Sequence, residues 1–112
     1  MSNVVRLADR GNPRRLVVFS RVELNQMLSI YSQRVMQGEW RDYAIDHGPG
    51  VAAFSIYRDA SNQPIFTIVK LAPGNGSDGD FLVRGGGRTL KRAGTLSEVL
   101  KIFRPALRVL SS

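Results

Sequence analysis

Two runs of β-branched and aromatic residues occupy the centre of the chain and constrain its fold more than any other feature. They extend from Val51 to Arg58 and from Ile65 to Leu71, and side chains of this kind favour the pleated surface of a sheet. Only the polar segment 59–64, which contains Asp, Ser, Asn and Pro, lies between them. Strand-forming runs separated by a short polar turn indicate a β-hairpin. We therefore predict an antiparallel hairpin at the centre of the fold.

Both faces of this hairpin carry apolar side chains. One face presents Phe54, Ile56, Phe66 and Ile68, and the other presents Val51, Ala53, Tyr57, Ile65, Val69 and Leu71. A sheet with one face in water should alternate more cleanly between apolar and polar residues. Either two helices cover opposite faces of the sheet, which is the simpler explanation and the one we favour, or a partner covers one face.

A helix is predicted on each side of the strands. Ser20 and Glu23 have the spacing of a capping box, in which each side chain accepts a hydrogen bond from the other residue's backbone N–H. Apolar residues then recur at helical spacing up to Gly38, which predicts a helix over residues 21–37. Thr95 and Glu98 repeat the capping-box pattern, and the helix that begins there ends before Pro105.

Shorter strands complete the predicted sheet. They are residues 16–19, 40–46, 81–84 and 88–92, with a last short strand at 106–110. Successive hairpins without crossover helices indicate an α+β fold. We expect a small antiparallel sheet with an N-terminal helix and a C-terminal helix. The single α+β domain spans residues 16–112, after a flexible basic lead-in of residues 1–15.

The charge of the chain is its most unusual property. Sixteen Lys and Arg residues against nine Asp and Glu residues give a net charge of +7, and thirteen of the sixteen are arginine. The absence of cysteine excludes disulfides and thiolate metal sites, which agrees with a reducing compartment. No apolar run approaches the roughly 20 residues that span a bilayer. We therefore expect a cytoplasmic protein with no membrane partner.

Nothing in the sequence has the pattern of a catalytic or metal site. His47 is the single histidine, so no second imidazole is present to share a metal ion. The segment 74–79 matches G-x-G-x-x-G, but a strand is predicted after it, where dinucleotide binding needs a helix. The turn 85–87 has glycines that suit a phosphate, without the Lys and hydroxyl residue of a nucleotide loop. We expect no enzyme activity, no cofactor and no metal, and we place a phosphate site at that turn third among the hypotheses.

Basic residues are concentrated in the C-terminal part of the chain. Seven of them, against Glu98 alone, lie between residues 84 and 108: Arg84, Arg88, Lys91, Arg92, Lys101, Arg104 and Arg108. A positive surface attracts polyanions through counterion release, so these residues are candidate contacts for an anion or a nucleic acid. The alternative is a solvated surface, because cations stabilise a helix C-terminus and protect sheet edges from pairing.

A second candidate surface surrounds the only tryptophan. Trp40 precedes Arg41, and both residue types are frequent anchors of protein interfaces. Large aromatic residues also dominate cores, and we favour a core position for Trp40. Together with Arg41, Tyr43 and Tyr57, it forms the candidate protein interface.

Two segments of the chain resemble a known family. They are Val18-Phe19-Ser20-Arg21-Val22-Glu23-Leu24-Asn25-Gln26 and Gly38-Glu39-Trp40-Arg41-Asp42-Tyr43-Ala44-Ile45-Asp46. Together with residues 53–58 and the leucine-rich C-terminal helix, they are similar to an alphaproteobacterial family described as domain of unknown function 2794. The resemblance covers residues 16–110 and implies a bacterial, cytoplasmic protein of one domain. It implies no activity, ligand or catalytic residue.

These features favour a non-enzymatic protein-interaction module. The hairpin with two apolar faces suggests that the sheet, or the surface around Trp40, binds a protein partner or a second copy of the chain. The alternative is a nucleic-acid-binding accessory protein that uses the basic C-terminal segment.

Overall fold

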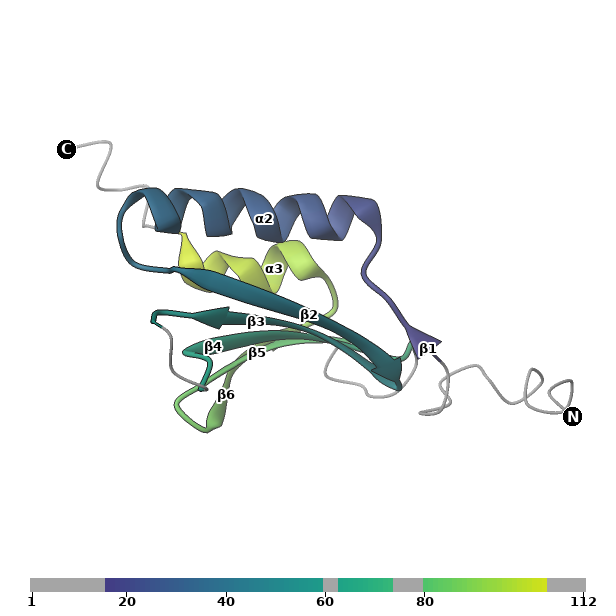
Figure 1. The fold of residues 1–112 in the computed structure, drawn as a ribbon. Coiled ribbons are helices and arrows are strands. Elements are labelled where there is room, and N and C mark those ends of the chain that lie inside the picture. Colours follow the sequence, from purple (N-terminus) through teal and green to yellow (C-terminus); the bar gives the residue numbers. More distant parts are fainter. Residues whose placement is uncertain (1–15, 60–62, 74–79, 105–112) are drawn as a thin grey trace, which may run out of the picture.

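Six strands form one antiparallel sheet in which each strand lies beside the next one in the sequence (Figure 1). The computed structural model describes residues 16–59, 63–73 and 80–104. The strands are β1 (Leu16–Val17), β2 (Asp42–Pro49), β3 (Val51–Tyr57), β4 (Phe66–Leu71), β5 (Phe81–Gly85) and β6 (Arg88–Ala93). The predicted α+β fold with an antiparallel sheet is confirmed. The lead-in 1–15, the glycine-rich segment 74–79 and the predicted strand 106–110 lie outside the described residues.

The hairpin between β2 and β3 is tighter than we predicted. Gly48 pairs with Val51, so only Pro49 and Gly50 form the turn. Gly50 adopts a φ of 78°, a conformation that glycine reaches without steric cost. The strand therefore continues through Gly48, beyond the predicted end at residue 46, because two residues suffice to reverse the chain.

The first helix, α2 (Arg21–Met36), begins with the predicted capping box. Glu23 N donates to Ser20 Oγ at 3.1 Å, and Ser20 N donates to Glu23 Oε1 at 2.7 Å. The helix ends at Gln37, and Gly38 follows with a φ of 78°. The prediction of a helix over residues 21–37 is confirmed to within one residue.

The second helix, α3 (Leu96–Leu100), continues as a 3-10 turn, η1 (Lys101–Phe103). Glu98 N donates to Thr95 Oγ1 at 3.3 Å, so half of the predicted second capping box is present. The reciprocal half was wrong: the Glu98 carboxylate lies instead 3.2 Å from Lys101 Nζ and 3.7 Å from Lys91 Nζ. The two ammonium groups hold the carboxylate away from the helix start.

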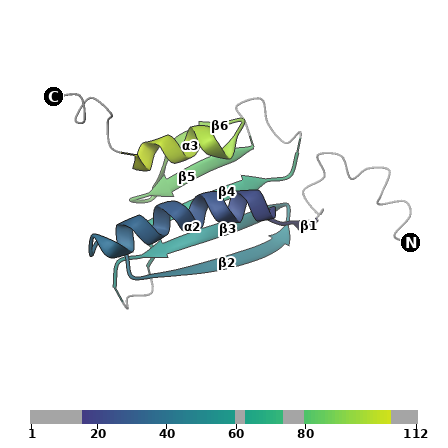
Figure 2. The same ribbon diagram turned by 90° about the horizontal axis from the view of Figure 1, so that it is seen from above.

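Both helices lie on the same face of the sheet (Figures 1 and 2). Seen from above, α2 runs along β3 and β4, and α3 lies over β5 and β6 (Figure 2). The favoured expectation that the helices cover opposite faces was therefore wrong. Trp40, at the end of the α2–β2 connection, packs edge-on against Phe103 of η1, with ring centroids 5.3 Å apart. A shared aromatic contact of this kind requires both helices on one side.

The core fills the space between the helices and the sheet. Its largest fully buried side chains come from both layers: Phe54, Met27, Ile56, Ile68, Leu100, Val83 and Val99. Aromatic rings extend it toward the C-terminal end of α2, where Tyr43 stacks on Phe54 with centroids 5.1 Å apart. Phe66 lies 5.0 Å from Phe103 in the same region. Such offset and edge-on ring pairs add to the stability gained from burial alone.

Two basic side chains join α2 to its neighbours, one to the sheet and one to η1. Lys70 of β4 donates to the Val18 carbonyl oxygen at 2.8 Å and to Glu23 Oε1 at 2.9 Å. Near the other end of α2, Arg34 pairs with Glu39 at 2.8 Å and donates to the Phe103 carbonyl oxygen. Each fastens a different end of α2.

Candidate functional site: the open face of the sheet

The candidate site is the face of the sheet that is turned away from α2 and α3. No helix or strand of the described residues lies over it (Figure 1). We call it the open face and define it by the strand residues that alternate with the core: Asp42, Ala44, Asp46, Val51, Ala53, Ser55, Tyr57, Thr67, Val69, Leu71, Leu82, Arg84 and Arg92.

The exposure of β3 shows the difference between the two faces directly. Ala52, Phe54 and Ile56 point toward the helices, and each is 0% exposed. The alternating residues of β3 are half-buried, except for Val51, which is 39% exposed. The two faces of one strand therefore have different environments, although both carry apolar residues.

Apolar side chains continue across the centre of the open face. Val69 is half-buried beside Ile68, which belongs to the core. Leu82 is 8% exposed but lies outside the core cluster formed by its neighbours Phe81 and Val83. Ala53, Val69 and Leu82 are consecutive partners across β3, β4 and β5. They form an apolar strip that the helices do not cover.

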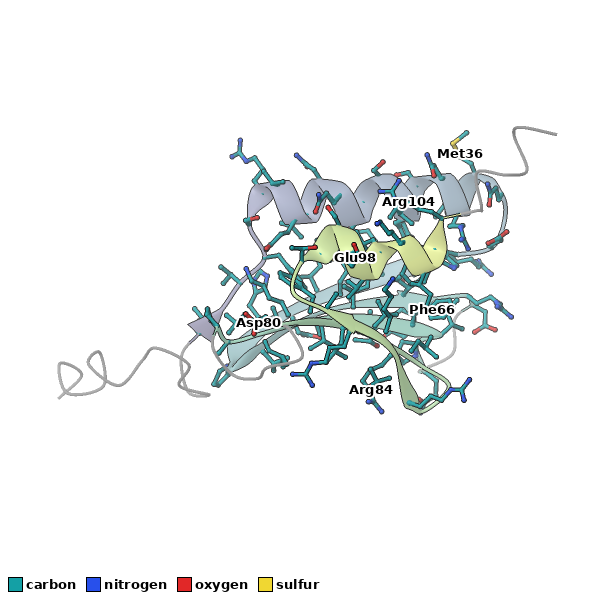
Figure 3. All side chains as sticks on the ribbon, turned by 180° about the vertical axis from the view of Figure 1, so that it is seen from behind. Met36, Phe66, Asp80, Arg84, Glu98 and Arg104 are labelled. Carbon is teal, nitrogen blue, oxygen red and sulfur yellow. The ribbon has the colours of Figure 1, made fainter. Side chains whose placement is uncertain are left out.

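Charged side chains flank this apolar strip with opposite signs on its two sides. Asp42 and Asp46 of β2 are exposed on one side. Arg84 of β5 and Arg92 of β6 are exposed on the other. Arg84 points away from the helices (Figure 3), and its Nη1 donates to Thr89 Oγ1 at 2.9 Å. An apolar centre with a charged rim is the usual anatomy of a protein interface.

The seven predicted basic contacts do not all share one face. Arg84 and Arg92 lie on the open face, and Arg88 is exposed at the start of β6. Lys91 and Lys101 lie on the helix side, where both contact the Glu98 carboxylate. Hydrogen bonding and charge from Lys101, then from Lys91, lower the pKa of Glu98.

The remaining two basic residues are separate from these groups. Arg104 follows η1 beside the helical layer, on the opposite side of the sheet from Arg84 (Figure 3). Arg108 lies outside the described residues. The structure therefore brings Arg84 and Arg92 together and places Lys91, Lys101 and Arg104 elsewhere.

The candidate protein interface around the tryptophan is divided in the same way. Trp40 is 3% exposed, and its ring packs against Tyr31, Phe66 and Phe103, so the core position that we favoured is what the structure shows. Tyr43 also belongs to the helix side.

Tyr43 is nevertheless 38% exposed, and Arg41 and Tyr57 are the other accessible members of that set. Arg41 is exposed and donates its backbone N–H to the Tyr57 carbonyl oxygen at 2.8 Å. Tyr57 is half-buried at the end of β3, opposite Asp42, and contributes to the open face.

The single histidine contributes to the junction between β1 and α2. The Phe19 N–H lies 3.5 Å from His47 Nε2, and the two rings meet edge-on with centroids 5.9 Å apart. Among the described residues, no group of three or more His, Asp or Glu side chains is placed to hold a metal ion. In the same part of the chain, no helix has the length and apolar character needed to cross a membrane.

The glycine turn between β5 and β6 has a structural explanation. Gly86 and Gly87 both have positive φ angles, of 61° and 80°, which fits a two-residue hairpin turn. At Gly85 the Phe66 and Leu90 side chains approach so closely that a Cβ atom would lie 2.9 Å and 3.0 Å from them. The third glycine is therefore required by packing.

Sequence reasoning missed the two carboxylates as part of a binding surface. Asp42 and Asp46 are exposed on the open face because both alternate with Tyr43 and Ile45, which lie on the helix side of β2. The signal was present in the period of two along β2. It could be interpreted only once the face covered by the helices was known.

The comparisons with known proteins place the chain at the level of its family. No curated protein and no solved structure matches it. A family model does match, over residues 17–100, and its description is Protein of unknown function (DUF2794). Those residues include both helices and all but the first residue of the sheet. The chain belongs to the DUF2794 family.

Proposed function

We propose that this protein is a non-enzymatic interaction module whose open face binds a protein. The observation that carries the proposal is that α2 and α3 cover one face of the sheet and leave the other with an apolar centre. Sheets of this kind usually bury one face and present polar residues on the other. Here Ala53, Val69 and Leu82 occupy positions that water-facing residues normally take.

The charged rim supports a protein as the ligand. A purely apolar strip would favour association without orientation, whereas charges at its border fix the position of a partner. Asp42 and Asp46 on one side, with Arg84 and Arg92 on the other, provide that orientation.

The alternative is a nucleic-acid-binding accessory protein that uses the basic half of the same surface. Arg84, Arg92 and the exposed Arg88 lie toward one edge of the sheet and are its specific support. Aromatic side chains on which bases stack are common in single-strand binders. Tyr57 is the aromatic residue of the open face, and it lies on β3, whereas the arginines lie on β5 and β6. The apolar centre between the two charged borders favours the protein ligand.

Site-specific photo-crosslinking tests the proposal. The photoreactive residue p-benzoyl-phenylalanine replaces Tyr57 or Val51 on the open face, and the crosslinked peptides are identified by mass spectrometry from the cells that make the protein. Val22, 66% exposed on α2, is the control position. We expect protein crosslinks from both open-face positions and none from Val22. Crosslinks that do not depend on the position would refute a binding function of this face.

A salt titration separates the nucleic-acid alternative from the proposal. Arg84→Ser with Arg88→Ser removes charge from the open side, and Lys91→Ser with Lys101→Ser removes the same charge from the helix side. A basic binding surface would lose affinity with the first pair only, and the slope of log affinity against log salt would fall by about 0.9 for each lost phosphate contact. If neither double substitution changes the affinity for duplex or single-stranded nucleic acid, the alternative is excluded.

A further inference from the structure

One row of five side chains crosses the whole open face, perpendicular to the strands. Direct pairing connects Asp46 to Ala53, Ala53 to Val69, Val69 to Leu82, and Leu82 to Arg92. Directly paired residues of antiparallel strands point to the same face. The row therefore reads negative, apolar, apolar, apolar, positive, from β2 to β6.

This row has a symmetry that a two-fold axis can use. Val69 is its middle residue, on the middle strand of the five. At about 4.8 Å between strands, Asp46 and Arg92 lie about 19 Å apart, at equal distances from Val69. If a second sheet stacks on the first through a two-fold axis that runs along β4, each Asp46 lies over the other copy's Arg92. An axis perpendicular to the strands would instead oppose Asp46 with Asp46 and Arg92 with Arg92.

The sizes of the apolar residues are complementary under the same symmetry. Ala53, with a small side chain, lies over Leu82 of the second copy, and the large Leu82 lies over the second copy's Ala53. Thr67, Val69 and Leu71 alternate along β4 and lie on the axis. Two sheets that pack in an aligned manner interdigitate their side chains in this way.

From this row we infer that the open face binds a second copy of the chain, as an isologous, two-fold, sheet-on-sheet dimer. The inference rests on the proposed function and names its partner. An isologous interface uses the same patch on both subunits and must complement itself. The row from Asp46 to Arg92 satisfies that condition in charge and in size.

The expected strength of the dimer is modest. Five strands at about 4.8 Å, and about six residues a strand at about 3.4 Å, give a face of roughly 24 by 20 Å. That is roughly 480 Å² for each copy and roughly 960 Å² for both, which is below the roughly 1,200 Å² that stable specific interfaces bury and in the range of weak, transient ones. We therefore expect a reversible dimer that forms at micromolar concentrations. Arg92 also makes an interaction within its own chain, and it keeps this interaction in the dimer. The guanidinium has five N–H donors, so it can serve a second carboxylate as well.

Charge reversal tests the arrangement, with sedimentation over a concentration series as the measurement. Asp46→Arg alone opposes two cations, and Arg92→Asp alone opposes two carboxylates, so each should weaken the dimer at least about tenfold. The double variant restores the pairs with reversed polarity and should dimerise like the original chain. Arg21→Asp, at the exposed start of α2, is the control with the same change in charge as Arg92→Asp.

The net charge of +7 makes this test discriminating. Arg92→Asp and Arg21→Asp lower the net charge equally, so general repulsion between copies would decrease in both. Only the two-fold pairing predicts that Arg92→Asp weakens the dimer while Arg21→Asp does not. If the double variant dimerises as weakly as the single variants, the inference is overturned.

A crosslinking measurement keeps the test independent of these charges. The chain contains no cysteine, so Val69→Cys gives each copy a single thiol. In the dimer this thiol lies at the two-fold axis. A short bis-maleimide should join two copies through Val69→Cys and leave Val22→Cys as monomers. Equal crosslinking at both positions would mean random collision and would refute the dimer.

The inference and the proposed function fail in different ways. If the chain sediments as a monomer at every concentration, and the open-face photo-crosslinks reach a different protein, the second copy is excluded and the proposed function stands. If the photo-crosslinks reach no protein at all, both are excluded. If they reach a peptide of this same chain, both are supported.

Discussion

The Lys70 ammonium lies 2.9 Å from the Glu23 carboxylate and 2.8 Å from the Val18 carbonyl oxygen, which joins the middle of the sheet to the first turn of α2. Burial alone would raise the pKa of Glu23, but hydrogen bonds from Lys70 and from the Ser20 N–H outweigh it and lower that pKa. A carboxylate whose pKa is lowered by folding stabilises the protein above its unfolded pKa. That stabilisation is lost as the pH falls through the folded pKa.

The first prediction concerns this acid dependence. Glu23→Gln keeps a side chain that can complete the capping box but removes the charge. We expect a lower Tm than the original chain near neutral pH, and a difference that shrinks as the pH falls below the ordinary carboxyl pKa of 4.5. Circular dichroism melts across that range measure it. Lys70→Met should produce the same loss, and a Tm difference that stays constant at every pH would contradict the assignment.

The second prediction compares neighbours on opposite faces of β4. Ile68→Thr places a hydroxyl in the core, where Ile68 is 2% exposed, and should lower the free energy of unfolding by about 2–4 kcal/mol. Val69→Thr places a hydroxyl on the open face, with less loss of volume than Ile68→Thr, and should cost less than about 1 kcal/mol. Urea denaturation at low protein concentration gives both values. Equal costs would mean that the open face is as buried as the core.

The third prediction concerns the glycine before the β5–β6 turn. A Cβ atom at Gly85 would lie 3.1 Å from the Ile65 carbonyl oxygen, a backbone atom, in addition to its two side-chain contacts. Gly85→Ala should therefore destabilise the fold by about 1–3 kcal/mol. Gly94→Ala is the matched control, because nothing lies within 4 Å of its Cβ position. It should be neutral or slightly stabilising, since alanine restricts the unfolded chain.

The fourth prediction concerns the planar group of Arg34. Its guanidinium pairs with Glu39, donates to the Phe103 carbonyl oxygen and lies 5.2 Å from the Trp40 ring centroid. A lysine cannot make these contacts together, so Arg34→Lys should lower the free energy of unfolding by about 1–2 kcal/mol. Arg21→Lys, at an exposed position, should change it little. A Tm for Arg34→Lys equal to that of the original chain would show that positive charge alone suffices.

Local patterns predicted the elements of this fold well. The Ser20–Glu23 capping box forms because both partners lie within one turn, and Glu23 Oε1 accepts from Ser20 N even though it also accepts from Lys70. The β-branched and aromatic residues of β3 predicted a strand because such side chains favour the pleated surface of a sheet. At the second cap the same spacing predicted only half of the outcome, because Lys91 lies on another element and competes for Glu98.

The candidate site depended on relationships that sequence spacing does not contain. The side of the sheet that α3 covers follows from the contact between Trp40 and Phe103, which are 63 positions apart. The cross-sheet row required the register of five strands, and a slip of one residue would have sent every side chain to the other face. The cluster of basic residues in the sequence was a poor guide for the same reason, because neighbours in the chain alternate between faces.

The sequential order of the strands has a consequence for how the chain folds. From β2 to β6 every strand pairs with its neighbour in the sequence through a hairpin, and each of these hairpins closes a short loop. The exception is β1, which pairs with β2 across α2. Loop closure of this kind costs little entropy, and domains rich in local contacts fold quickly. The slow steps should be those that join α2 to the C-terminal turn, because Arg34 and Phe103 are 69 positions apart in the sequence. A sheet that assembles before its helical cover would expose both apolar faces at once, which is the moment when this chain is most vulnerable to aggregation.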